Sequence, residues 1–177
     1  MTRIQSLIER NADFSAGYTP AALSPPTSGS VIISCLDHRL PPEIFLHLQS
    51  GDAPVIRNSG GRVTSSVIND LGLLVQLTSK VFGLAETDTA FEVAVIHHTQ
   101  CGTGFLQDPA FRRATSELTG VGESDLAASI VDDPTRTVRE DVAKLRSDPG
   151  ISSRISVSGH VYDLATGRLT TVIDSDR

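Results

Sequence analysis

The sequence predicts an α/β fold in which helices flank a mostly parallel central β-sheet, with an N-terminal helical arm. Short apolar runs at residues 31–35 and 91–98 have the continuous hydrophobic character of strands buried on both faces. Segments with apolar residues at three- and four-residue spacing alternate with these runs. Reactive side chains directly follow both runs, where ligands collect in parallel sheets.

Residues 1–30 are expected to form a helix and a proline-containing arm. Apolar residues at helical spacing predict a short amphipathic helix over residues 2–12. Three prolines between residues 15 and 30 favour an extended chain. A helix at the end of such an arm can pack on a second subunit.

Residues 31–177 are expected to form one zinc-binding α/β catalytic domain. After the strand at 31–35, the pattern predicts a helix-like stretch at 42–49, a weaker strand at 53–57 and a longer helix capped by Ser65 or Ser66. The strand at 91–98 is followed by a helix that starts at Asp133-Pro134 and by strands at 155–162 and 169–173. No helix or strand is predicted for the acidic segment 107–133.

Composition limits the class of function. With 39% hydrophobic residues, the 177-residue chain fits a single domain with a substantial core. The net charge of -6 and the lack of a Lys/Arg run argue against a nucleic-acid or anionic-membrane binder. Charged residues interrupt the apolar positions of residues 1–11, so neither a secretory signal nor a membrane span is expected, and we expect a cytoplasmic protein.

Two short motifs carry the candidate chemistry. Cys35-Leu36-Asp37-His38-Arg39 follows the first strand, and His98-Thr99-Gln100-Cys101 follows the strand at 91–98. Together they supply two thiolates and one imidazole, a donor set suited to tetrahedral zinc with an open fourth position. A disulfide between the two cysteines is the alternative, but an intracellular chain of this size does not need one. Four further histidines are left out of the metal site: His38, His47, His97 and His160.

The pattern Cys-x-Asp-x-Arg followed by His-x-x-Cys resembles the zinc site of β-carbonic anhydrases. The resemblance extends to residues 51–61, which lead into an Arg-Asn-x-Gly loop, and to residues 157–163. It implies that Cys35, His98 and Cys101 are zinc ligands, and that Asp37 and Arg39 form a dyad beside the metal. It also implies a homodimer or a larger assembly of dimers.

The dyad answers a chemical need of such a site. Two thiolates cancel the charge of Zn²⁺, so they should lower the pKa of bound water less than three imidazoles would. Asp37 can orient zinc-bound hydroxide, while Arg39 holds the carboxylate away from the metal. If that ion pair opened, Asp37 would fill the fourth position, and the chain would be a non-catalytic, zinc-stabilised binding module. A thiol redox sensor is a weaker alternative, because the chain has no Cys-x-x-Cys.

The expected substrate is a small linear heterocumulene attacked by the zinc-bound hydroxide. Carbon dioxide would be hydrated to bicarbonate, and carbonyl sulfide would be hydrolysed to hydrogen sulfide and carbon dioxide. Gly60, Gly61 and Gly102 are expected to let the backbone approach the metal pocket. Ala53 is expected in the channel wall, where a small residue would admit the larger sulfur atom.

Overall fold

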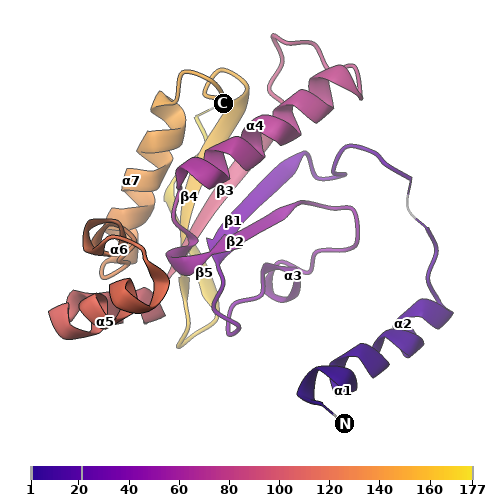
Figure 1. The fold of residues 1–177 in the computed structure, drawn as a ribbon. Coiled ribbons are helices and arrows are strands. Elements are labelled where there is room, and N and C mark those ends of the chain that lie inside the picture. Colours follow the sequence, from indigo (N-terminus) through magenta and orange to yellow (C-terminus); the bar gives the residue numbers. More distant parts are fainter. Residues whose placement is uncertain (1, 21, 177) are drawn as a thin grey trace.

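A five-stranded sheet organises the chain, as a computed structural model of residues 2–20 and 22–176 describes it (Figure 1). The strands are β1 (Ser30–Cys35), β2 (Val55–Asn58), β3 (Phe91–His98), β4 (Ile155–Asp163) and β5 (Arg168–Ile173). They lie in the order β2-β1-β3-β4-β5, and all neighbours are parallel except β4 and β5. The predicted α/β fold with a mostly parallel sheet is therefore confirmed.

Two long helices cover one face of this sheet. They are α4 (Ser65–Lys80) and α7 (Pro134–Ser147). Their buried residues share one core cluster with alternate residues of the strands: Val67, Leu71, Val75, Val138, Val142 and Leu145 meet Val31, Ile33, Val93, Val95 and Val157. The helix predicted at Asp133-Pro134 is confirmed, because the Asp133 carboxylate caps α7 by accepting from the amides of Thr135 and Arg136.

Two predicted elements differ from the structure in their details. The cap of α4 is Thr64 rather than Ser65 or Ser66, since the Thr64 hydroxyl accepts from the amide of Val67. The helix-like stretch at 42–49 is only the single turn α3 (Pro42–Phe45). It stops there because His47 takes a left-handed backbone conformation, with φ of 53°.

The N-terminal segment forms two short helices, α1 (Arg3–Glu9) and α2 (Asn11–Ala16), instead of the one predicted over 2–12. Neither helix buries a residue. Figure 1 shows both standing apart from the sheet at the end of an extended connection. No helix within residues 2–20 and 22–176 is both long and apolar enough to cross a membrane.

Two helices form within segment 107–133, to which the sequence interpretation gave no element: α5 (Pro109–Thr119) and α6 (Glu123–Ala128), which fold beside the end of the sheet (Figure 1). Two 3₁₀ helices precede them in the chain: η1 (Ser59–Gly61), after β2, and η2 (Gly102–Gln107), after the second motif. Asp108 caps the start of α5, and Gly120 ends it with φ of 74°. Neither α5 nor α6 has a fully buried residue. Phe111, Ala114 and Leu118 of α5 still recur at helical spacing, a pattern that the sequence interpretation missed.

Candidate metal centre

Three predicted ligands converge at the carboxyl end of the sheet. Cys35 is the last residue of β1 and His98 the last of β3, and these strands are parallel neighbours. A short turn then brings Cys101 back, so that one donor atom from each of the three residues lies within 4.8 Å of the other two. The two sulfurs are 4.0 Å apart. Two sulfurs at about 2.3 Å from a tetrahedral zinc would stand about 3.8 Å apart, so the spacing fits a shared metal.

The hydrogen bonding of the His98 ring also fits metal binding. Its Nδ1 donates to the carbonyl oxygen of Thr99 at 2.9 Å. The other ring nitrogen, Nε2, is buried and has no hydrogen-bond partner among residues 2–20 and 22–176. A buried polar atom without a partner is costly, and a metal ion between Nε2 and the two sulfurs would satisfy it. Together these residues form a Cys-His-Cys metal site.

The two cysteines are free thiols rather than a disulfide, since a disulfide would hold its sulfurs about 2.05 Å apart. Each is buried, and the two sulfurs lie within hydrogen-bonding distance of one another. A hydrogen bond from the Cys35 thiol lowers the pKa of Cys101 to about 4, while the same bond and burial raise the pKa of Cys35. One member of the pair is therefore readily available as a thiolate, the form that binds metals.

Asp37 and Arg39 form a tight ion pair beside the ligands. The guanidinium donates from Nη2 to Asp37 Oδ2 at 2.6 Å and from Nε to Oδ1 at 3.0 Å. These bonds hold the pKa of Asp37 well below its ordinary value, so the carboxyl is ionised. Arg39 Nη2 also donates to the carbonyl oxygen of Gln100 at 3.1 Å. Gln100 has the left-handed φ of 56°, a conformation that is costly for a non-glycine residue and is found at functional turns.

Arg57 holds the first motif from the neighbouring strand β2. Its Nε donates to the carbonyl oxygen of Cys35 at 2.9 Å, and its Nη2 to that of Asp37 at 2.7 Å. The sequence interpretation placed Arg57 only in the Arg-Asn-x-Gly stretch and gave it no role. The sequence did hold a signal for this role, because Arg57 ends a predicted strand, as the ligand Cys35 does.

A cavity of about 820 Å³ opens over the two cysteines. Asp37, Arg39, Gly60 and Gly102 line it with Cys35 and Cys101. The remaining wall is largely apolar and comes mostly from η2, α5, α6 and the turn between these last two: Leu36, Leu106, Phe111, Val121 and Leu126. The segment 107–133, unassigned from the sequence, therefore supplies much of the cavity wall.

The two remaining predicted pocket residues do not line this cavity. Ala53 lines a different cavity with Pro54, Leu77 and Phe91. It precedes β2, and so stands at the amino end of a sheet whose carboxyl end holds the ligands. The pocket that we propose therefore omits Ala53.

Gly61 lies under the loop that carries Cys35, where an added Cβ would come within 2.8 Å of the Ser34 carbonyl carbon and 2.9 Å of the Cys35 amide nitrogen. Its role is close backbone approach.

The other histidines stay outside the cluster of ligands. The His38 side chain is 95% exposed. His97 is buried but points to α7, with Nδ1 2.8 Å from Thr137 Oγ1 and Nε2 3.3 Å from Asp141 Oδ2. His160 bonds to Ser158 and Thr171 on β4 and β5.

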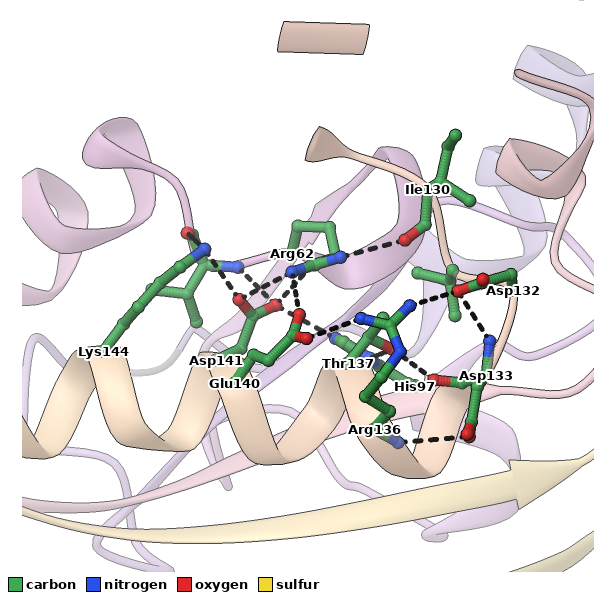
Figure 2. A network of polar contacts seen from close by, with 12 residues as sticks. Arg62, His97, Ile130, Asp132, Asp133, Arg136, Thr137, Glu140, Asp141 and Lys144 are labelled. Carbon is green, nitrogen blue, oxygen red and sulfur yellow. Dashed lines mark hydrogen bonds and ion pairs between the residues drawn. The ribbon is translucent and has the colours of Figure 1, made fainter. Parts of the chain in front are cut away.

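A buried polar network centred on Asp141 lies behind the site. Figure 2 shows Arg62 between the carboxylates of α7 and the carbonyl oxygen of Ile130. Asp141 accepts from Arg62 Nε at 2.7 Å, from the Val63 amide at 3.0 Å and from Lys144 Nζ at 3.0 Å. Burial raises the pKa of Asp141, but the nearby His97 ring nitrogen, 3.3 Å away, and the hydrogen bonds from Arg62 outweigh it and leave the pKa low. Sequence reasoning missed this network, although a carboxylate within the apolar stripe of a helix is a signal for a buried ion pair.

Known proteins are similar to this chain along most of its length. The family model described as carbonic anhydrase matches residues 30–169. The chain is 30% identical over 172 residues to beta-carbonic anhydrase 1 of Mycobacterium tuberculosis, covering 97% of this chain and 99% of that relative. It is 26% identical over 158 residues to a carbon disulfide hydrolase of Acidithiobacillus thiooxidans, covering 78% and 74% of the two chains. The crystal structure of a carbonic anhydrase from Streptococcus mutans matches with a TM-score of 0.79 and 32% identity, over 97% of this chain and 98% of that one.

Proposed function

The chain belongs to the β-carbonic anhydrase family, and from this premise we propose that it is a zinc enzyme that adds water to a small linear heterocumulene. The observation that carries the proposal is the convergence of Cys35, His98 and Cys101 beside an ionised Asp37 at the base of a cavity. Zinc held there would supply a Lewis acid that activates water for attack on the substrate carbon.

The protein's own residues have distinct tasks in this proposal. Asp37 lines the cavity and stays ionised, so it would accept a hydrogen bond from the attacking water and direct a lone pair toward the carbon. Arg39 fixes both carboxylate oxygens and ties them to Gln100, which keeps Asp37 from turning toward the metal. This favours an open metal site over the alternative of a closed, non-catalytic zinc module.

We propose carbonyl sulfide beside carbon dioxide as a substrate. The largely apolar wall from residues 106–126 supports this choice, because a sulfur atom is larger and less strongly hydrated than oxygen and gains more from an apolar surface. The similarity to a carbon disulfide hydrolase is compatible with it. Hydrolysis would consume one water and release hydrogen sulfide and carbon dioxide, whereas hydration of carbon dioxide would release bicarbonate and a proton.

A homodimer is also part of the proposal. Four apolar side chains of α1 and α2 are between 50% and 63% exposed: Ile4, Leu7, Ile8 and Phe14. Among the described residues, β2 pairs only with β1 and leaves its other edge open. Exposed apolar helices and open sheet edges are usually covered in the functional assembly.

We also propose a cytoplasmic location, because its reducing conditions would keep both ligand cysteines as free thiols.

Parallel assays test this function. Bicarbonate formation from carbon dioxide and sulfide release from carbonyl sulfide would be measured on one zinc-loaded preparation and on its metal-free form. We expect both activities to need the metal. If the loaded protein accelerates neither reaction while zinc stays bound, the closed binding module becomes the better description. Rapid bicarbonate formation without sulfide release would leave carbon dioxide as the substrate.

A further inference from the structure

The hydroxyl of Thr103 lies between a main-chain amide and a metal ligand. Its Oγ1 accepts from the Val131 amide at 3.1 Å and stands 3.2 Å from Cys101 Sγ. An amide N–H can only donate, so it uses one of the two lone pairs of the hydroxyl oxygen. The hydroxyl hydrogen is then directed to its other neighbour, the sulfur of Cys101.

A metal-bound cysteine is a thiolate, which can accept a hydrogen bond but not donate one. On the premise of the metal site proposed above, we infer that Thr103 is a positioning residue that donates a hydrogen bond to the ligand sulfur of Cys101. Such a bond withdraws electron density from the sulfur, which then donates less charge to the metal. With Thr103 in place, a bound zinc ion would therefore keep more of its positive charge than two thiolates would otherwise leave it.

The amide that orients Thr103 is itself held in place. Val131 is 3% exposed and packs in one cluster with Cys35, Leu40 and Cys101. The carbonyl oxygen of the preceding residue, Ile130, accepts from Arg62 Nη1 at 3.0 Å (Figure 2). Arg62 is in turn bound to the buried Asp141. The Arg62–Asp141 pair thus anchors the donor that fixes the direction of the Thr103 hydroxyl.

Paired substitutions separate this role from simple packing. Thr103→Val removes the hydroxyl while keeping a branched side chain of similar shape, and Thr103→Ser keeps the hydroxyl while removing the methyl group. Both variants and the unmodified protein would be loaded with Co²⁺, whose sulfur-to-cobalt charge-transfer absorption reports the electron density on the ligand sulfurs. Metal affinity would be measured by competition with a chelator.

We expect the charge-transfer band of Thr103→Val to move to longer wavelength, because sulfur lone pairs without a hydrogen bond lie higher in energy. Its metal affinity should fall about 10-fold, in the range that outer hydrogen-bond partners of metal ligands contribute. Thr103→Ser should keep both the band position and the affinity. If Thr103→Val does not fold, Thr103→Ala replaces it, with the same expectation.

An unchanged band in the variant without a hydroxyl would overturn the role of Thr103, and so would an equal shift in Thr103→Ser. In both cases the unmodified protein would still bind Co²⁺ through sulfur, and the proposed metal site would stand. Absence of any sulfur-to-cobalt band in the unmodified protein would instead refute the metal site, and the inference with it.

Discussion

The guanidinium of Arg57 donates to the carbonyl oxygen of Cys35 at 2.9 Å, and so ties the end of β1 to β2. A second bond reaches the carbonyl oxygen of Asp37 at 2.7 Å. One side chain thus fixes the backbone of both the ligand Cys35 and Asp37, the residue proposed to orient the attacking water. Because Arg57 touches only main-chain oxygens here, it shapes the loop without competing for the metal or for Arg39.

Arg39→Ala should leave the metal in place and lower the activity. The guanidinium contacts Asp37 and Gln100 but none of the three ligands, so the loss falls on the orientation of Asp37. We expect kcat/KM to fall about 100-fold, at the upper end for such supporting contacts. Arg113→Ala is the matched control, since the Arg113 side chain is 70% exposed and does not line the metal cavity. Full activity in zinc-loaded Arg39→Ala would remove Arg39 from the mechanism.

Asp141→Asn should destabilise the fold by about 3–5 kcal/mol near neutral pH, because it leaves the buried Arg62 with only the half-exposed Glu140 as an ionised partner. The pKa of Asp141 in the folded protein lies below its ordinary value of 3.8. Its contribution to the free energy of unfolding is therefore complete above that value and is lost as the pH falls through the lower, folded-state pKa. Urea unfolding across this acidic range should show the gap between the two proteins narrowing.

Asp70→Asn serves as the control, because Asp70 is an exposed aspartate on α4. It should change the unfolding free energy little at any pH. A pH-independent gap for Asp141→Asn would show that shape rather than charge sets its contribution.

Deleting residues 1–28 should weaken the proposed dimer. No residue of α1 or α2 is buried within its own chain, so their apolar side chains would be available to a second copy. Sedimentation at micromolar concentration is expected to show a dimer for the full chain and a larger monomer fraction after the deletion. A full chain that is already monomeric, together with unchanged activity after deletion, would argue decisively against this role.

Phe111→Asn should lower the activity toward carbonyl sulfide more than toward carbon dioxide, by roughly 10-fold in the ratio of the two kcat/KM values. Phe111 lines the metal cavity from α5. Leu118, on the same helix, is 87% exposed and is absent from the cavity wall. Leu118→Asn is therefore the control and should leave the ratio unchanged. Equal losses toward both substrates in Phe111→Asn would count against an apolar wall that selects sulfur.

The strands and the ligand set could be predicted because their signals are local. The apolar runs ending at Cys35 and His98 are buried on both faces, and parallel strands bring their carboxyl ends together. The start of α7 at Asp133-Pro134 could likewise be predicted from its cap and its apolar stripe. Asp108-Pro109 carries the same start signal for α5, and Phe111, Ala114 and Leu118 recur at helical spacing after it. The sequence therefore held a signal for α5 that our interpretation missed.

The contacts that support the ligands depend on tertiary structure. Thr103 meets Val131 only because η2 folds back against the segment before α7. Asp141 meets Arg62 across a long stretch of chain, and neither residue has a neighbour in sequence that predicts the other. Ala53 was expected in the channel wall because it belongs to the stretch that leads into the Arg-Asn-x-Gly loop, but β2 separates it from the carboxyl end of the sheet.

The central claim is that Cys35, His98 and Cys101 hold one catalytic zinc. Elemental analysis of the purified protein, combined with thiol titration of the same sample, tests it most directly. The geometry of the three donors predicts about one zinc per chain, with both cysteines unreactive until the metal is removed. Protein that contains no metal, and in which both thiols react freely, would contradict the claim.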